Sequence, residues 1–270
     1  MEPLDVWFDD SGGDELPLPP ELAALYGPLR LPRRSDRAHV FTNFVSSVDG
    51  VVAIDPPRGT GGDISGRDPH DRAVMALLRA VADAVVVGAG TLRAEPRHLW
   101  TADRLAGELA EPCRALRAAL GLARQPLQIV VTGAGNVDLS WRVFQGEAPV
   151  LVATTAAGAA RLRAQGKPVR IVEAGGAGPG VPLAAALAAA GVGAGARVLC
   201  ECGPTLHAAF LAEGAVDEIF LSVAPSVVGR PRGVTVFGLA EGLLLGTDQR
   251  LRLASARRRE SFLFLRYAVR

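Results

Sequence analysis

Short apolar runs alternate with helical patterns through most of this 270-residue chain. The spacing predicts strands at 39–46, 83–88, 127–132, 149–153, 169–173, 197–202 and 216–224, and helices at 68–81, 155–165, 181–191 and 204–213. Strands and helices that alternate in this way form a mostly parallel sheet with helices on both faces. The alternation therefore predicts an α/β fold.

The last two segments follow a different pattern. Residues 248–256 and 260–269 alternate apolar and polar side chains, and the basic stretch 257–259 between them predicts a solvated turn. We expect this C-terminal antiparallel hairpin to close one edge of the sheet. Earlier in the chain, Pro112 interrupts the polar region 103–121, which predicts two helical pieces or a loop.

Residues 1–37 are acidic and rich in proline, with one short helical pattern near 21–26, so we interpret them as an N-terminal extension of a domain spanning 38–270. Their start has neither the positive region nor the apolar region of a signal peptide. The uncharged stretch 174–196 is mostly alanine and glycine, too weakly apolar for a membrane span, and predicts a glycine loop before a short buried helix. We expect a cytoplasmic protein with no membrane partner.

Charge and cysteine content exclude two further classes of partner. The formal net charge of +1 gives no electrostatic basis for binding nucleic acid. Cys113, Cys200 and Cys202 are too few for a disulfide framework, and the last two lack zinc-ligand spacing. The sequence therefore predicts interior or cleft-lining thiols and no metal site.

Three glycine-containing loops follow predicted strands, and ligands bind beyond the carboxyl ends of strands in parallel sheets. In the first, Gly88-Ala89-Gly90-Thr91 permits close backbone approach to a ligand. It is not a dinucleotide fingerprint, because position 93 is arginine where the third glycine would stand. The second, Thr132-Gly133, suits a nucleotide phosphate or ribose and equally suits a plain turn.

The third loop begins the helix at 204–213 with Gly203-Pro204. Proline at the first helical position leaves the amides of Thr205 and Leu206 available to an anion, although an ordinary capped helix explains the same residues. Glu201 has apolar neighbours, and a buried carboxylate needs a partner. We therefore expect Glu201 at the exposed end of its strand or in a polar cleft.

The strand at 39–46 also brings polar side chains toward its end. Alternation places Asn43 and Ser47 on one face, and Asp49 with the following glycine indicates a turn. An ordinary turn and a ligand pocket both fit this pattern. In the polar stretch that follows, Asp68 predicts a helix N-cap. Arg79 lies beside the apolar stripe of that helix, and a solvent-facing arginine would occupy the same position.

Together these segments resemble the reductase domain of bacterial riboflavin biosynthesis, within the dihydrofolate reductase-like superfamily. The matching stretches occur in family order and cover about residues 38–270: NFVSSVDG (43–50), ISG (64–66), LLRAVADAVVVGAGTLRAE (77–95), VVTGAG (130–135), ECGPTLHAAFLAEGAVDEIFLSVAPSVVG (201–229) and the closing hairpin. The resemblance implies a dihydrofolate reductase-like mixed sheet and a homodimer. It further implies NADPH-dependent hydride transfer to a phosphoribosylamino-pyrimidine of the 5-amino-6-(5-phosphoribosylamino)uracil type, which reduces the opened sugar to a ribitylamino chain.

The resemblance also implies roles for individual residues. The expected cofactor-binding residues are Gly88, Gly90, Thr91, Thr132, Gly133, Gly203, Pro204, Thr205 and Leu206. The expected substrate-binding residues are Asn43, Ser47, Ser65, Arg79 and Glu201, with Arg79 as a candidate ligand of the substrate phosphate because a planar guanidinium binds phosphate through two donors. Glu95 and Asp49 are the candidate proton donors, and Glu95 is preferred; structural hydrogen bonds at a helix end or turn also fit both.

The chain departs from the family pattern at three positions. Many relatives have lysine at Asn43, Asp-Asp-Pro at Glu95-Pro96, and a small residue at Cys202. Dihydrofolate, a pterin or another imine or carbonyl therefore remains an alternative substrate, and a non-catalytic nucleotide-binding protein is the second alternative. With no zinc motif of a deaminase, we expect a stand-alone reductase. Arg93 and Arg161 are candidates for the extra phosphate of NADPH, and no motif excludes NADH.

Overall fold

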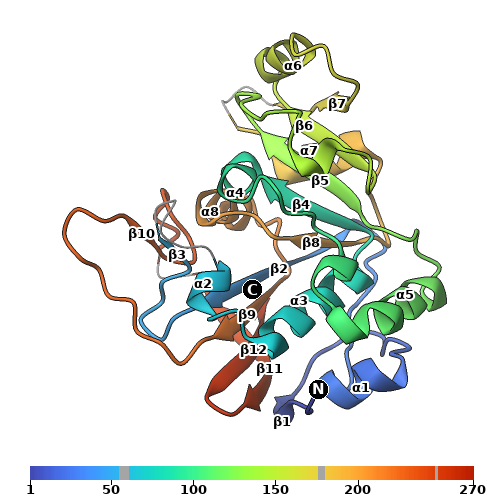
Figure 1. Ribbon diagram of the computed structural model, residues 1–270, viewed down its shortest axis with the longest axis vertical. Coiled ribbons are helices and arrows are strands. Elements are labelled where there is room, and N and C mark those ends of the chain that lie inside the picture. Colours follow the sequence, from blue (N-terminus) through green and yellow to red (C-terminus); the bar gives the residue numbers. More distant parts are fainter. Residues whose placement is uncertain (55–60, 176–179, 247–248) are drawn as a thin grey trace.

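The protein is built on one large mixed sheet, seen in Figure 1. The computed structural model describes residues 1–54, 61–175, 180–246 and 249–270. The sheet has ten strands in the order β1-β11-β12-β9-β2-β8-β4-β5-β6-β7. Their bounds are β1 Asp5–Asp9, β2 His39–Ser46, β4 Ala84–Gly88, β5 Leu127–Thr132, β6 Val150–Thr154, β7 Arg170–Glu173, β8 Arg197–Cys200, β9 Glu218–Val223, β11 Leu251–Arg259 and β12 Phe262–Val269.

Neighbouring strands run parallel from β9 across the sheet to β7. At the other end, β12, β11 and β1 join as antiparallel strands. A separate small sheet pairs β3 (Ala53–Ile54) with β10 (Val236–Phe237). The predicted mostly parallel mixed sheet with a C-terminal antiparallel hairpin is confirmed. The predicted hairpin begins at residue 248, which lies outside the described residues, and β11 begins at Leu251.

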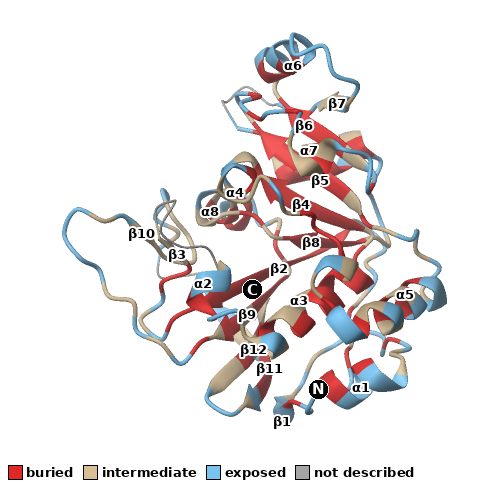
Figure 2. Ribbon diagram, in the orientation of Figure 1, coloured by how far each residue is buried: buried red, intermediate tan, exposed pale blue. Residues whose placement is uncertain are grey.

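Helices cover both faces of the sheet, as the alternating pattern predicts. On one face lie α1 (Pro20–Tyr26), α3 (Pro69–Val81), α4 (Ala89–Ala94), α5 (Ala110–Ala119) and α6 (Ala156–Arg163), and on the other lie α7 (Leu183–Ala190) and α8 (Pro204–Ala212). The short α2 (Gly61–Ile64) and three single 3₁₀ turns, Ala102–Arg104, Gly107–Leu109 and Arg142–Phe144, complete the helical segments described. Figure 2 shows the buried residues concentrated in the sheet strands.

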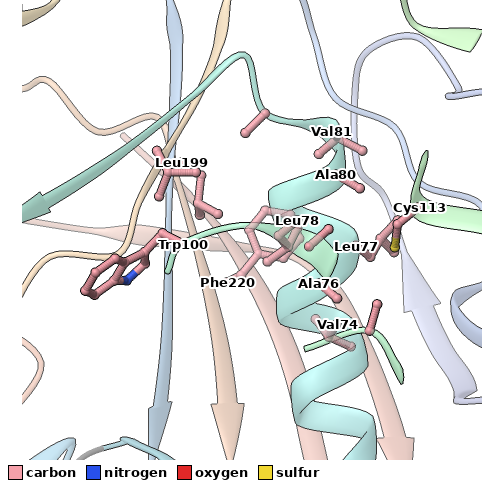
Figure 3. Close-up of a cluster of buried hydrophobic side chains, with 14 of the residues drawn as sticks. Val74, Ala76, Leu77, Leu78, Ala80, Val81, Trp100, Cys113, Leu199 and Phe220 are labelled. Carbon is pink, nitrogen blue, oxygen red and sulfur yellow. The ribbon is translucent and has the colours of Figure 1, made fainter. Parts of the chain in front are cut away.

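The core on the α3 face is continuous with the central strands. Leu77 and Leu78 of α3 are fully buried, and Figure 3 shows their cluster meeting Leu199 of β8 and Phe220 of β9. The helix begins as predicted, with the Asp68 carboxylate accepting the amide hydrogens of the first turn and proline at the first helical position. This packing fixes the helix that carries several polar residues toward the site.

Some local predictions differ from the structure. The region 103–121 does contain separate helical pieces, the last two 3₁₀ residues of Ala102–Arg104, the turn Gly107–Leu109 and α5, but Pro112 does not divide them. It lies in the first turn of α5, where backbone N–H groups have no partner within the helix. The helix predicted after the uncharged stretch is α7, and residues 176–179 of the predicted glycine loop lie outside the described residues. All three cysteines are buried free thiols, which confirms their predicted interior packing. No helix among the described residues is long and apolar enough to cross a membrane.

The prediction of a solvated turn at 257–259 is wrong. These residues belong to β11, and the chain reverses at Glu260, whose φ is 50°. Arg257 is only 1% exposed. Its guanidinium donates to the Asp9 carboxylate at 2.6 Å and to the backbone carbonyls of Tyr26 and Pro28 at 2.8 and 2.9 Å. A pattern of three consecutive arginines could not reveal this, because Arg257 is buried by a segment about 230 to 250 residues away.

Residues 1–37 thus contribute to the same sheet and core as the rest of the chain. β1 pairs with β11, and Leu22 and Leu25 of α1 join the buried cluster on the α3 face. The predicted domain boundary between residues 37 and 38 stays a prediction from sequence. In the structure, the extension and the hairpin are held together through Arg257.

We predict that Arg257→Met lowers the free energy of unfolding by about 3 to 5 kcal/mol, because it leaves the mostly buried Asp9 carboxylate without its charged partner. Arg258→Met on the same strand is the matched control. Arg258 pairs with Asp5 at the surface, so its loss should change stability by less than about 1 kcal/mol. Urea unfolding of both variants checks this, and equal midpoints would contradict the assigned role of Arg257.

Candidate active site

A cavity of about 1470 Å³ opens where the parallel strands end at their carboxyl termini. Its walls include the ends of β4 and β5, the loop after β8, strand β2 and one side of α3. Cavities for single small ligands are typically about 300 to 1,000 Å³. This cavity is therefore large enough for a cofactor and a substrate together.

The cofactor loops predicted from sequence all line this cavity. The lining includes Gly88, Gly90, Thr91, Thr132, Gly133, Gly203, Pro204, Thr205 and Leu206. At Gly88 an added Cβ would lie 3.2 Å from the Leu206 side chain, so a larger residue would crowd the approach of α8 to β4. The first-turn amides of α8 face no acceptor within their own helix. Backbone donors and three threonine side chains thus line the cavity together.

The loop after β5 is held in shape by its own polar groups. The Thr132 hydroxyl accepts a hydrogen bond from the Gly135 amide, and the Thr155 hydroxyl donates to the Gly133 carbonyl at 2.7 Å. Arg93 of α4 donates to the Asn136 carbonyl of the same loop and lines the cavity. Arg161, the other sequence candidate for a cofactor phosphate, is not among the cavity-lining residues. Glycine backbone, hydroxyls and one arginine fit a dinucleotide phosphate.

Arg79 and Glu201 form a buried, two-pronged ion pair in the cavity wall. The Arg79 Nε donates to one Glu201 carboxylate oxygen at 2.7 Å, and Nη2 donates to the other at 2.6 Å. The Nη1 group donates to the carbonyls of Leu99 and Thr101, and Nη2 also reaches His98. Every N–H of Arg79 therefore has an acceptor in the protein. The interpretation of Arg79 as the phosphate ligand does not fit this geometry.

His98 connects this pair to Glu95. Burial, with the positive charges of Arg79 and Arg104 nearby, lowers the pKa of His98 to about 3, so the ring is neutral near pH 7. Its Nε2 lies 3.1 Å from Arg79, which can only donate, so Nδ1 carries the ring hydrogen. Nδ1 lies 3.4 Å from the Glu95 carboxylate. The four side chains form a continuous polar chain from Glu95 to Glu201 along the cavity wall.

The other candidate proton donor, Asp49, has a structural role in this geometry. Hydrogen bonds from the Ser47 hydroxyl and from the amides of Val228 and Gly229 lower the pKa of Asp49 to about 2. An ionised carboxylate has no proton to donate at neutral pH. Neither Asp49 nor Ser47 is among the cavity-lining residues, so the structure does not bring these two predicted residues to the site.

The remaining substrate candidates that line the cavity come from elements other than the predicted cofactor loops. Asn43 of β2 and Ser65, which follows α2, both line it and are 9% and 5% exposed. Asp71 of α3 joins them and is 3% exposed. Burial raises the pKa of Asp71 to about 6, even though Ser222 and Ser65 hydrogen-bond to it.

Several residues of the site were not predicted from sequence. His98 lies in an irregular segment with no strand or helix pattern, and Arg104 ends the 3₁₀ turn that follows it. Asp71 belongs to the polar start of α3. Arg72 and Arg104 line the cavity, and no hydrogen bond or ion pair of either side chain is recorded within the described part of the chain. The sequence contained one signal of these residues. Along α3, cavity-lining side chains recur at spacings of three and four residues, at Arg72, Met75 and Arg79.

Comparison with known proteins identifies the family. The RibD C-terminal domain family matches residues 38–261. The chain belongs to this family. The match begins at residue 38, where the sequence also predicted the start of the domain, and it includes every site residue discussed above.

Three relatives illustrate how far the similarity extends. The chain is 29% identical over 200 residues to the 2,5-diamino-6-ribosylamino-4(3H)-pyrimidinone 5′-phosphate reductase of Archaeoglobus fulgidus, covering 74% of this chain and 86% of that protein. It is also 29% identical over 210 residues to the riboflavin biosynthesis protein RibD of Mycobacterium tuberculosis, covering 76% of this chain but only 48% of that protein.

The fold is shared with RibD of Acinetobacter baumannii, with a TM-score of 0.61 at 22% identity. That similarity covers 87% of this chain and 58% of the other. The chain thus spans about half the length of the RibD proteins it matches. The predicted fold class and membership of the riboflavin reductase domain family are both confirmed.

We predict that Arg79→Lys lowers the free energy of unfolding by roughly 3 kcal/mol, since lysine cannot keep both bonds to the buried Glu201 carboxylate and both backbone bonds. Arg72→Lys, seven residues earlier on the same helix, is the control and should change stability by less than about 0.5 kcal/mol. Guanidinium unfolding measures both. A fully stable Arg79→Lys protein with weakened affinity for a phosphorylated substrate would instead restore Arg79 as the phosphate ligand.

Proposed function

We propose that the protein is an NADPH-dependent reductase that transfers hydride to a phosphoribosylamino-pyrimidine. The observation that supports it best is that all nine predicted cofactor residues line the same cavity as Glu95, His98 and the Arg79–Glu201 pair. The named activity of the archaeal relative, which this chain matches over most of its length, supports the same reaction class. Membership of the RibD C-terminal domain family is consistent with both.

The choice of NADPH over NADH rests on Arg93. This arginine is exposed, lines the cavity beside the predicted cofactor loops, and within the described residues makes one hydrogen bond, to the Asn136 carbonyl. Its other N–H groups can therefore bind the phosphate that distinguishes NADPH, and a guanidinium is well suited to that task. The bound cofactor supplies the hydride.

The protein's chemical task is to orient the substrate and deliver one proton. Hydride adds to the C1′ carbon of the opened, imine form of the sugar, and the imine nitrogen takes a proton to become the amine. Glu95 lies in the cavity wall directly after α4, the helix that begins at the Gly88–Thr91 loop. The neutral His98 holds the Glu95 carboxyl in place from its Nδ1 side. Glu95 is the proton donor in this mechanism, and it regains its proton from solvent.

The substrate phosphate binds at Arg72 and Arg104 in this proposal. Both arginines line the cavity, and both lie close enough to His98 to lower its pKa. Unlike Arg79, they have no recorded protein acceptor within the described residues, so their N–H groups are available. A phosphorylated sugar would therefore be held by two cations of the cavity wall.

A pterin or other imine or carbonyl substrate is the alternative, and it does not need Arg72 or Arg104. A nucleotide-binding protein without catalysis would bind NADPH but transfer no hydride. The cytoplasmic location and the homodimer stay predictions from sequence and family resemblance.

We expect the purified protein to oxidise NADPH when given a phosphoribosylamino-pyrimidine, and to do so at least about tenfold more efficiently than with NADH, because only NADPH carries the phosphate that Arg93 would bind. Absorbance at the nicotinamide band gives kcat/KM for each cofactor. Dihydrofolate and the dephosphorylated pyrimidine are tested in parallel. The loss of the substrate phosphate should raise KM.

Turnover of dihydrofolate alone would contradict the proposal in favour of a pterin reductase. Saturable NADPH binding with no turnover of any substrate would favour a binding protein.

We predict that Glu95→Gln lowers kcat by about 10² to 10⁴, the range typical of losing a positioned general acid, with NADPH affinity almost unchanged. Glutamine keeps the shape and a hydrogen-bond acceptor for His98 but has no proton to transfer. Glu108→Gln, at an exposed carboxylate away from the cavity, is the control and should keep wild-type turnover. Near-normal kcat in Glu95→Gln would remove Glu95 from the mechanism.

A further inference from the structure

His207 is a buried histidine that the proposed reaction does not use. It lies on α8, directly after the predicted cofactor loop, and its side chain is fully buried. Its Nδ1 lies 2.9 Å from the Leu239 carbonyl, which can only accept, so Nδ1 carries the ring hydrogen. Its Nε2 then accepts from the Thr42 hydroxyl at 3.4 Å, and its ring packs against Phe44 with the centroids 4.7 Å apart. His207 thus joins α8 both to β2 and to the segment after β10.

A second set of contacts ties the same segment to the start of α8. The Glu241 amide donates to the Pro204 carbonyl at 3.3 Å. The Glu241 carboxylate accepts the Gly238 amide at 2.6 Å and so closes the turn between these two residues. Residues 238–241, which we call the bridging turn, are therefore anchored on the first turn of α8. The amides of that turn belong to the predicted cofactor loop.

The chain directly before the bridging turn forms one wall of the cavity. β10 pairs with β3 through two residue pairs, Val236 with Ile54 and Phe237 with Ala53. The Phe237 carbonyl also accepts the Val52 amide at 2.9 Å. All of these residues except Val236 line the cavity. Figure 1 shows this wall, which we call the β3–β10 wall, apart from the ten-stranded sheet.

So short a pair of strands depends on its surroundings for order. An isolated two-stranded pairing is marginally stable in water even when it is longer than this one. The side chains of β3 and β10 are only half-buried, so their own packing contributes little. The order of the β3–β10 wall therefore depends on the contacts that hold its ends, and the bridging turn is the contact on the side of α8.

We propose that the bridging turn makes the affinity for the substrate depend on the cofactor. A dinucleotide bound at the first turn of α8 holds Glu241 and His207 in place, and these two hold the β3–β10 wall against the substrate. Glu241 and His207 are positioning residues, since neither is among the described residues that line the cavity. This inference rests on the proposed function, because it takes both ligands from it.

The coupling has a simple thermodynamic origin. The first ligand immobilises the bridging turn, so the second ligand meets a wall that is already ordered and loses less conformational entropy on binding. The effect is reciprocal, so the substrate raises the affinity for the cofactor by the same factor. Coupling between two sites is typically about 5- to 150-fold. A wall that is rigid without the cofactor would give no coupling.

Calorimetry measures this coupling with 5-amino-6-(5-phosphoribosylamino)uracil as the ligand. NADP⁺ replaces NADPH, so both ligands bind without hydride transfer. We expect the Kd of the pyrimidine to fall about tenfold when NADP⁺ is saturating. Glu241→Ala should reduce this ratio to below about threefold, because the bridging turn loses the acceptor that closes it. Its Kd for NADP⁺ alone should stay within about twofold of the wild-type value.

Two further variants serve as controls. Glu241→Gln keeps a side-chain oxygen that can accept the Gly238 amide, so it should keep the wild-type ratio. This variant separates the hydrogen bond from other effects of replacing the residue. Glu173→Ala removes a surface carboxylate of β7 that pairs with Arg163, and it should also leave the ratio unchanged.

Hydrogen exchange tests the β3–β10 wall without the substrate. NADP⁺ alone should slow exchange of the Val52 amide, which bonds to Phe237 at the other end of the connection, by about fivefold or more. Glu241→Ala should remove most of this slowing, while the Leu206 amide of α8 stays protected by the cofactor.

Equal affinity of the wild type for the pyrimidine with and without NADP⁺ would overturn the proposal. An unchanged ratio in a folded Glu241→Ala protein, or Val52 exchange that NADP⁺ does not slow, would overturn it as well. Slower Val52 exchange that depends on Glu241, in a protein that turns over no pyrimidine, would support the role of the bridging turn while contradicting the proposed reductase function.

Discussion

The paired bonds between Arg79 and Glu201 are the interaction on which the site depends. Arg79 belongs to α3, and Glu201 directly follows β8, so the pair fixes a covering helix to the centre of the sheet. The same guanidinium holds the carbonyls of Leu99 and Thr101 and the ring of His98, and it thereby orders the irregular segment after α4. An arginine in such a position acts as a fixed cross-link, and its charge is already neutralised before any ligand arrives.

The two ends of the cavity use different physical means of recognition. At the cofactor end, glycine backbone and the first turn of α8 offer amide hydrogens, which suit phosphates and require little of the side chains. Elsewhere in the cavity, the wall is formed by side chains of α3 and β2. Backbone groups thus shape one part of the cavity, and side chains shape the other.

Sequence patterns revealed the framework of the site better than its internal connections. Valine-rich strands that end in glycine located β4 and its loop, and the proline after Gly203 located the start of α8, because both signals are local. Burial of Arg79 and Arg257 was not visible, since each is covered by segments distant in sequence that supply its acceptors. The structural role of Asp49 was hidden for the same reason, because the hydrogen bonds that hold it as an ionised turn residue come from Val228 and Gly229, almost 180 residues away.

The pairing of β1 with β11 has a consequence for how the protein is made. Asp9 and Arg257 are 248 residues apart, so the first strand of the chain must wait for almost the whole polypeptide before its partner exists. At a synthesis rate of about 5 to 20 residues per second, that wait lasts roughly 12 to 50 s. During this time Val6, Trp7 and Phe8, which remain partly exposed even in the finished sheet, are available to other chains. The acidic residues that flank these three keep the nascent strand charged until the hairpin is complete.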